Sequence, residues 1–302
     1  MKKKLSYIAG ITVFLIIAVA GLTAYPRYVT YNSKAKAFRA MERAVLAQAH
    51  SWRGDCAVVI RDMAYPKLSV KVNEDKIFPA ASLIKLPILA VAFKAIDEGR
   101  FSLDTVLVIG RGDIAGGSGR IKTMNLPQRL KVRQLMAYMI AYSDNTATNV
   151  FIRLMGYDYL NSGFKSLGLQ HTVLRRAMMD FSGRDRGVEN YTSAADIALI
   201  LEGIHNKKLV SKKYCQLAVY LLKKQTVRDR LPLYLPNNAS VANKTGLERG
   251  VVHDAGIVFS SKGNYVICVL TGKVKAYKKA KNFIAQMSRL AYNAYSGNSR
   301  RR

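Results

Sequence analysis

Ser82 and Lys85, in the stretch PAASLIKLPIL, are a hydroxyl and an amine at a spacing that suits nucleophilic catalysis. If a helix starts at Ser82, three residues correspond to about 300° of turn, so both side chains share a face. A neutral lysine amine can then accept the hydroxyl proton, and the positive helix end favours the alkoxide. The alternative is a serine that caps the helix and a lysine in solvent. The same spacing recurs at two other places, so the pair alone does not decide.

The sequence further along the chain favours the catalytic role. The apolar run LPILAVAF after Lys85 predicts a buried helix, in which a lysine needs a partner or a shifted pKa. The tripeptide Ser-Asp-Asn at 143–145 follows another apolar helical stretch. Ser143 can relay a proton to a leaving nitrogen, and the carboxamide of Asn145 can hold a substrate amide.

A second tripeptide, Lys-Thr-Gly at 244–246, lies in a predicted strand. Lys244 and Thr245 offer a cation and a hydroxyl for a substrate carboxylate. Gly246 has no side chain, so a substrate can lie along the strand at this position. Each tripeptide also has an ordinary structural explanation, as a helix cap or a strand end. Their occurrence in this order, after Ser-x-x-Lys, favours acyl transfer at a serine.

The set Ser-x-x-Lys, Ser-Asp-Asn and Lys-Thr-Gly resembles the signature shared by class A β-lactamases and penicillin-binding proteins. The likeness covers about residues 45–295 and includes GGSGRI, SDNTATN and KTGLERGVVHDAGIVF. It implies an acyl-serine enzyme without a cofactor, with Ser82 as nucleophile and Lys85 as candidate base. The resemblance also implies an oxyanion hole made by the backbone N–H groups of Ser82 and Leu247.

One departure from the family pattern concerns the release of the acyl group. Class A β-lactamases carry a glutamate between the two tripeptides that activates the deacylating water. Laying TVLRR on the segment that leads into that loop puts Met178 at the position of the glutamate, and a thioether cannot abstract a proton. Acids follow at Asp180, Asp185 and Glu189, of which Asp180 is the candidate substitute base. The missing glutamate favours a D-Ala-D-Ala peptidase and the overall likeness favours a β-lactamase.

The elements that must position these groups predict an α+β, three-layer α/β/α fold. Its antiparallel sheet comes from both ends of the chain, and a mainly helical subdomain is inserted between them. Alternating or continuous apolar runs predict strands at 55–63, 67–73, 241–246, 253–261 and 264–272. Helical patterns cover 82–97, most of 101–195, 193–204 and 277–294.

The sequence of the N-terminus predicts that the body of the protein functions outside the cytoplasm. Three lysines precede an uncharged stretch from Leu5 to Tyr25, long enough to span a bilayer at about 20 residues, with the N-terminus inside. A shorter apolar core that ends in Ala-Val-Ala also fits a cleaved signal peptide. We expect an anchor or signal peptide over 1–25, a linker over 26–45, a hydrolase domain over 46–295 and a basic tail over 296–302.

The net charge indicates which classes of partner the protein can bind. The chain has 48 basic and 19 acidic residues, a net charge of +29. The basic residues are spread along the chain without a zinc-finger, RNP or helix-turn-helix pattern, which argues against nucleic acid. An anionic membrane or cell wall suits the charge, with a β-lactam or peptidoglycan stem peptide as substrate.

Cysteines and histidines give no sign of a disulfide framework or a metal site. The three cysteines, Cys56, Cys215 and Cys268, lie in apolar contexts that predict buried thiols. The four histidines are far apart, and neither HExxH nor a Cys/His cluster is present. We therefore expect no metal ligands.

Two other classes of function remain open. A penicillin-binding sensor would acylate once and signal through its anchor, although only Met1–Lys4 would lie inside the cell. A non-catalytic wall-binding protein could retain the fold. The retained Ser82, Lys85, Ser143 and Lys244 argue against that second alternative.

Overall fold

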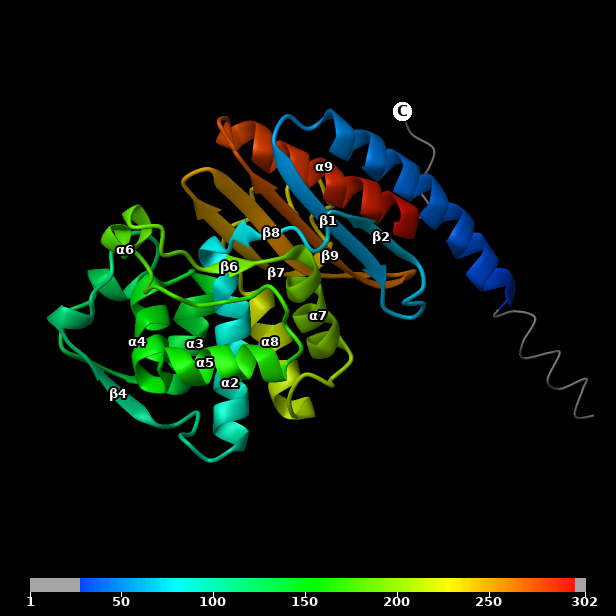
Figure 1. Cartoon of the computed structure of the whole chain (residues 1–302). Coiled ribbons are helices and arrows are strands. Elements are labelled where there is room, and N and C mark those ends of the chain that lie inside the picture. The colour runs from blue at the N-terminus through cyan, green and yellow to red at the C-terminus, as the bar shows by residue number, and fades with distance from the viewer. Residues whose placement is uncertain (1–27, 297–302) are drawn as a thin grey trace, which may run out of the picture.

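A five-stranded antiparallel sheet built from both ends of the chain forms the middle layer of the computed structural model, which describes residues 28–296 (Figure 1). The strand order is β2-β1-β9-β8-β7, so the first and last parts of the sequence pair directly through β1 and β9. The strands are β1 (Asp55–Asp62), β2 (Ser69–Val72), β7 (Ser240–Glu248), β8 (Val251–Ser260) and β9 (Gly263–Gly272). In this order β7 is an edge strand, with one side free of β-pairing.

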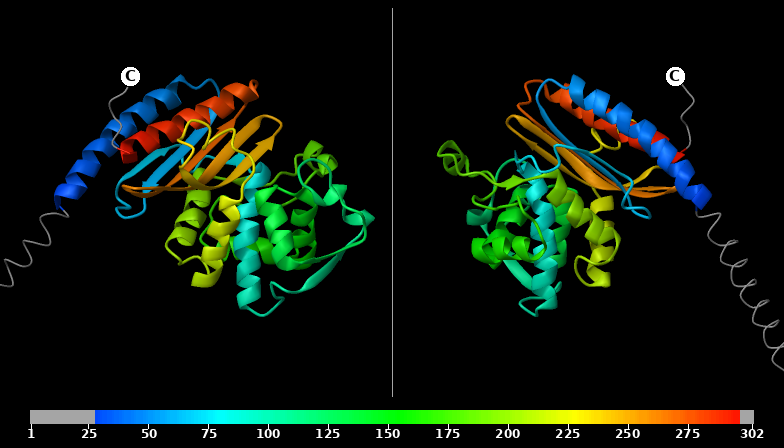
Figure 2. Two further views of the ribbon diagram at one scale, coloured as in Figure 1. Left: turned by 180° about the vertical axis from the view of Figure 1, so that it is seen from behind. Right: turned by 45° about the vertical axis from the view of Figure 1, so that its right-hand side comes forward.

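Two long helices cover one face of this sheet (Figure 2). One runs over residues 28–51 and the other is α9 (Tyr277–Ser296). Phe38 and Val45 of the first helix are buried in a core that includes Phe283 and Met287 of α9. Most of the segment expected as a linker over 26–45 is therefore helical and packed on the sheet.

The helical subdomain covers the opposite face of the sheet (Figure 1). Its central helix, α2, is buried on nearly every side because the run LPILAVAF is apolar all round. The surrounding helices are α3 (Val132–Ala141), α4 (Asn145–Met155), α5 (Tyr157–Ser166), α7 (Ala194–His205) and α8 (Lys212–Lys223), with α2 at Lys85–Asp97.

Short elements complete this subdomain. Two small antiparallel pairs join β3 to β6 and β4 to β5. Helix α6 lies in the loop between α5 and α7, and η1 precedes α2. Their bounds are β3 (Phe78–Pro79), η1 (Ala81–Ile84), β4 (Val106–Ile109), η2 (Arg111–Asp113), η3 (Ile121–Thr123), β5 (Gln128–Lys131), α6 (Phe181–Asp185) and β6 (Tyr191–Thr192).

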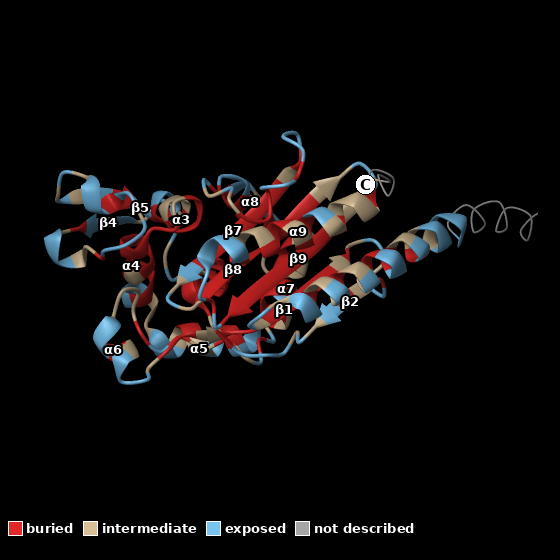
Figure 3. Ribbon diagram, turned by 90° about the horizontal axis from the view of Figure 1, so that it is seen from above, coloured by how far each residue is buried: buried red, intermediate tan, exposed pale blue. Residues whose placement is uncertain are grey.

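The strands have continuous runs of apolar residues because helices cover both faces of the sheet. Along β9, Val266, Cys268 and Leu270 belong to the core shared with the helical subdomain. The alternate residues Tyr265 and Ile267 belong to the core under α9. Successive residues of this strand therefore belong to different cores, and Figure 3 shows that the strand is mostly buried.

The α+β, three-layer prediction is confirmed, and the five sheet strands and the helices predicted outside 101–195 lie within a few residues of their predicted bounds. The prediction that most of 101–195 is helical is wrong, because its first α-helix is α3 and the preceding residues pair as β4 and β5 or form 3₁₀ turns. The helix expected from Ser82 begins instead with the 3₁₀ turn η1, and the strand expected over 67–73 is confined to β2. No helix within residues 28–296 is long and apolar enough to cross a bilayer. The anchor or signal peptide expected over 1–25 lies outside the described residues, as does the tail after Ser296.

Candidate active site

Ser82 lies in η1 at the surface of a cavity of about 530 Å³. The residue before it, Ala81, has a φ of 45°, in the left-handed region that a non-glycine side chain adopts at a cost of about 1–3 kcal/mol. The 3₁₀ turn places the side chains of Ser82 and Lys85 above one another, because residues i and i+3 eclipse in this geometry. The local backbone thus places the two residues on the same face of the turn.

Lys85 is fully buried behind the serine as the first residue of α2. Its Nζ donates to the backbone oxygen of Ser143 at 2.6 Å and to Oδ1 of Asn145 at 2.8 Å. Burial lowers the pKa of Lys85 well below its ordinary value, and repulsion from Lys244 lowers it further. A neutral amine has two N–H donors, so with both directed at these two oxygens its lone pair can accept a proton from a neighbouring hydroxyl.

Ser143 stands between the two buried lysines. Its Oγ lies 3.2 Å from Nζ of Lys85 and accepts from Nζ of Lys244 at 3.0 Å. The backbone of Ser143 is left-handed, with φ of 53°. Burial lowers the pKa of Lys244 to about 7, although the Asp254 carboxylate opposes that shift. The three groups form a continuous path along which a proton can move.

The two residues after Ser143 hold the surrounding loop and contribute to the cavity. Asp144 caps α4 by accepting from the backbone N–H of Ala147 at 3.0 Å, and it also accepts from the N–H groups of Arg120 and Ile121. Asn145 lines the cavity and donates through Nδ2 to the Gly116 oxygen at 2.9 Å. The Ser-Asp-Asn tripeptide therefore anchors the loop before it as well as presenting a carboxamide.

Strand β7 carries Lys244, Thr245 and Gly246 along the free edge of the sheet. A Cβ at Gly246 would lie 3.2 Å from His253 and 3.5 Å from the Ala80 oxygen, so a glycine permits this close approach of β7 to the serine turn. Leu247, the next residue, lines the cavity. The structure brings all the residues predicted around the serine together, with Ser82, Asn145 and Leu247 at the cavity surface.

The loop between α5 and α7 forms the remaining wall and contains Met178. Asn149 of α4 holds this residue by its backbone, accepting from Met178 N–H at 2.8 Å and donating to Met178 oxygen at 3.1 Å. Both Met178 and Met179 line the cavity. An apolar wall therefore stands where the resemblance leads one to expect a deacylating glutamate.

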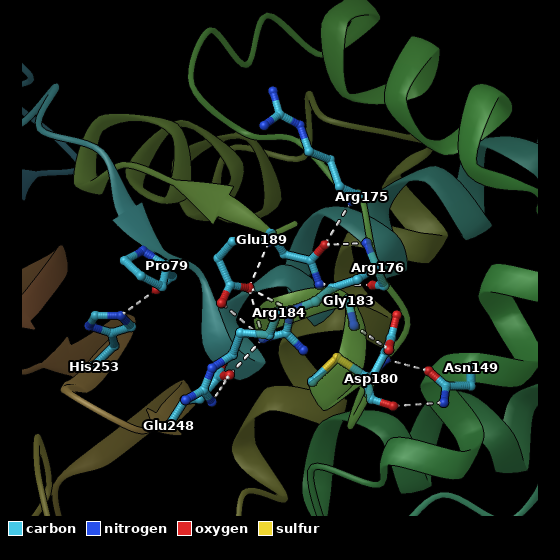
Figure 4. A network of polar contacts seen from close by, with 12 residues as sticks. Pro79, Asn149, Arg175, Arg176, Asp180, Gly183, Arg184, Glu189, Glu248 and His253 are labelled. Atoms are coloured by element: carbon cyan, nitrogen blue, oxygen red, sulfur yellow. Dashed lines mark hydrogen bonds and ion pairs between the residues drawn. The ribbon is translucent and has the colours of Figure 1, made fainter. Parts of the chain in front are cut away.

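The acids of this loop have separate surroundings (Figure 4). The Asp180 carboxylate caps α6 by accepting from the Gly183 N–H at 2.8 Å, and Asp180 is not among the residues that line the cavity. Asp185 lines the cavity, whereas Glu189 is paired with the buried Arg176. The role of Asp180 as a base stays a prediction, and its carboxylate already serves the helix.

An ion cluster that the sequence analysis missed ties this loop to β7. Arg176 donates to both carboxylate oxygens of Glu189, at 2.9 Å and 3.0 Å, and to Glu248 at 2.6 Å. Arg184 also donates to Glu248, at 3.0 Å. Figure 4 shows Glu248 reaching from the strand toward both arginines. Because 72 residues separate Arg176 from Glu248, no local pattern in the sequence could have indicated the pair.

The prediction of buried cysteines is confirmed. All three cysteines are free and buried. Within residues 28–296, no three His, Cys, Asp or Glu side chains gather in a way that can hold a metal ion.

Comparisons with known proteins agree with this geometry. A sequence model of the beta-lactamase enzyme family matches residues 37–295. The extended-spectrum beta-lactamase PER-1 of Pseudomonas aeruginosa is 25% identical over 240 residues, which cover 73% of this chain and 76% of PER-1. A beta-lactamase structure from Sphaerobacter thermophilus is 29% identical with a TM-score of 0.79, covering 86% of this chain and 98% of that one.

A further structural neighbour was solved in a covalent state. It is a point mutant of PBP-A in an acyl-enzyme complex with penicillin G. Its identity to this chain is 29% and its TM-score 0.75, over 87% of this chain and 97% of the neighbour.

Proposed function

Because this chain belongs to the beta-lactamase enzyme family, we propose that it is an acyl-serine hydrolase that acts on β-lactams or on D-Ala-D-Ala peptides of the cell wall. One observation carries the proposal: Ser82 lines the cavity, and the buried Lys85, three residues further along, has a lowered pKa and directs its N–H groups at the oxygens of Ser143 and Asn145. An amine in that state is a general base, and a hydroxyl beside it is a nucleophile.

In the acylation step, Ser82 Oγ bonds to the substrate carbonyl carbon and the C–N bond of the lactam or peptide breaks. The Ser82 proton goes to Lys85. Lys85 passes a proton to Ser143, whose own hydroxyl proton goes to the leaving nitrogen, so Lys85 returns to the neutral form. The Ser143 hydroxyl, 3.2 Å and 3.0 Å from the two lysine amines, supports this relay. The N–H groups of Ser82 and Leu247 stabilise the developing oxyanion.

Release of the acyl group requires a water activated by a base, and Met178 supplies none. Losing a positioned base typically slows the step it serves by about 10²–10⁴-fold. Acylation through Lys85 is therefore fast relative to deacylation of a penicilloyl group. This imbalance favours a penicillin-binding or peptidase-like enzyme over an efficient β-lactamase.

We also propose that the enzyme works outside the cytoplasm, next to an anionic envelope. The lysines and uncharged stretch before Tyr25 support a membrane anchor or an export signal, and the net charge of +29 supports binding to an anionic wall. Both sources of support lie in the sequence.

Intact-protein mass spectrometry of the chain mixed with benzylpenicillin tests the function. We expect an adduct that is stable over time on the wild type and absent from Ser82→Ala. Ser118→Ala is the matched control, because Ser118 also lines the cavity and should leave labelling intact. Rapid loss of the adduct with drug turnover would identify a β-lactamase. Labelling of Ser82→Ala would refute the assignment of the nucleophile.

A further inference from the structure

His253 is a fully buried histidine in β8, beside the active site and unused by the steps above. Its Nε2 lies 2.9 Å from the backbone oxygen of Pro79, as Figure 4 shows. The backbone N–H of Thr271 donates to its Nδ1 at 3.2 Å. The ring also meets Phe78 edge to face, with the centroids 6.0 Å apart. Contacts on three sides fix the ring in one orientation.

These contacts determine the tautomer. A backbone N–H can only donate, so Nδ1 of His253 accepts from Thr271 and Nε2 carries the proton. The Nε2–H therefore donates to the Pro79 oxygen. Burial lowers the pKa of His253 to about 4, so the ring is neutral near neutral pH.

His253 contacts the two chain segments that carry the oxyanion-hole N–H groups. Pro79 lies three residues before Ser82, and Gly246 lies one residue before Leu247. His253 is the register partner of Gly246 in the β7–β8 pair, and a Cβ at Gly246 would lie 3.2 Å from both Cβ and Cδ2 of the histidine. The ring thus sits at the junction of the serine turn and the edge strand.

We propose that His253 is a positioning residue for the oxyanion hole, holding the Ser82 turn against β7 so that the N–H groups of Ser82 and Leu247 converge on one oxygen. The proposal rests on the acyl-serine function proposed above. An oxyanion donor typically contributes about 10²–10³-fold in rate, and a misplacement of about 1 Å can cost 10²-fold. A shift of the Pro79–Ser82 segment therefore lowers the acylation rate constant more than it weakens noncovalent binding of the substrate.

Two amide side chains separate positioning from simple packing. In glutamine, the terminal NH₂ reaches about as far as imidazole Nε2, so His253→Gln can still donate to Pro79. In asparagine, the shorter amide oxygen replaces Nδ1, so His253→Asn keeps the Thr271 contact and loses the Pro79 contact. Both variants are polar, neutral and smaller than the wild-type side chain. Ile267→Ala, on β9 in the core under α9, is the control for lost stability alone.

The measurement separates binding from chemistry on the full chain. Stopped-flow acylation by benzylpenicillin gives the noncovalent dissociation constant and the acylation rate constant. Phenylboronic acid supplies a second readout, because the Ser82 oxygen adds to boron, its proton moves to Lys85, and the tetrahedral adduct needs the oxyanion hole. The melting temperature of each variant is recorded alongside.

We expect His253→Asn to lower the acylation rate constant and the boronate affinity by at least about tenfold, with the noncovalent dissociation constant changed less than about twofold. His253→Gln should retain both within about threefold. Equal losses in the two amide variants, or the same losses in Ile267→Ala at an equal melting temperature, would overturn the positioning role. Wild-type rates in His253→Asn would overturn it too. A wild type that forms no penicilloyl adduct would instead refute the proposed function, and this inference with it.

Discussion

At the scale of residues, two buried lysines with different partners divide the work around Ser143. Lys85 has its N–H bonds directed at oxygen acceptors and is poised to take a proton. Lys244 donates to Ser143 and to the Thr245 oxygen from the edge strand, where a substrate carboxylate would lie. Catalysis needs the first lysine neutral and benefits from a positive charge on the second. Burial lowers the pKa of both lysines, which favours the role of Lys85 as a base and opposes the role of Lys244 as a cation.

The pH dependence of acylation tests this division. Lys85 becomes a base only above its lowered pKa, so the second-order acylation rate constant should rise with pH on the acid side. Lys244 loses its charge as pH rises through about 7, so the rate constant should fall above that point. Lys244→Arg should move the falling limb to higher pH, since arginine stays charged. A falling limb unchanged by this substitution would assign it to another group.

Met178→Glu tests the missing base. The loop holds the backbone of Met178 through Asn149, so a glutamate there would present its carboxylate from a fixed position on the cavity wall. We expect release of a bound penicilloyl group to accelerate by about 10²-fold or more. Met178→Gln is the matched control, with the same length and no base, and should release the adduct at the wild-type rate. Equal release rates in the two variants would show that position 178 does not reach the hydrolytic water.

At the scale of elements, the site depends on a loop and a strand held together by charge. The loop between α5 and α7 contributes Met178 and Met179 to the cavity, and β7 contributes Leu247. Glu248 of β7 joins them through ion pairs with Arg176 and Arg184. The shape of the cavity therefore depends on this ion cluster, in which Arg176 is the buried arginine.

Arg176→Ala tests that dependence. The substitution leaves Glu189 without its bidentate partner and Glu248 with Arg184 alone. Removing one member of a buried pair typically destabilises a protein by about 3–5 kcal/mol. We expect a loss of that size in urea unfolding, together with faster proteolysis of the loop. The exposed neighbour Arg175, replaced by alanine, should change stability by less than about 0.5 kcal/mol. Equal effects of the two substitutions would contradict the role of the cluster.

At the scale of the whole molecule, the sheet separates two apolar cores with different tasks. The core on the subdomain side supports α2 and the catalytic groups. The core on the other side joins the helix over 28–51 to α9 and closes the two ends of the chain together. The buried residues of this second core include Val241 of β7 but none from η1, α2 or α4, which carry Ser82, Lys85 and Asn145. Stability and catalysis can therefore be perturbed separately.

Phe38→Ala tests this separation. Phe38 is buried and meets Tyr295 of α9 edge to face, at 6.3 Å between ring centroids. We expect a loss of about 3–5 kcal/mol in the free energy of unfolding, with the acylation rate constant of the folded protein unchanged. The exposed neighbour Arg39, replaced by alanine, should leave both quantities unchanged. A stable Phe38→Ala variant would show that this helix is dispensable to the domain.

The features that depend on local patterns could be predicted from the amino-acid sequence. Periods of two and of about 3.6 predicted the five sheet strands and the helices outside 101–195 to within a few residues, and the strand patterns at both ends of the chain predicted one antiparallel sheet. The three motifs predicted which residues would surround Ser82, since each places its functional groups within four adjacent positions. The three apolar cysteine contexts likewise predicted buried thiols.

The features that depend on contacts between distant segments could not be predicted before the fold was known. Pairing of Arg176 with Glu248, and of His253 with Pro79, spans 72 and 174 residues. These contacts exist because closure of the sheet brings β7 and β8 against the serine turn and the loop. The lowered pKa values of Lys85 and Lys244 have the same origin, since desolvation is a property of the packed interior. The sequence specifies the chemical identity of a side chain, whereas its protonation state and its hydrogen-bond or ion-pair partners depend on the folded structure.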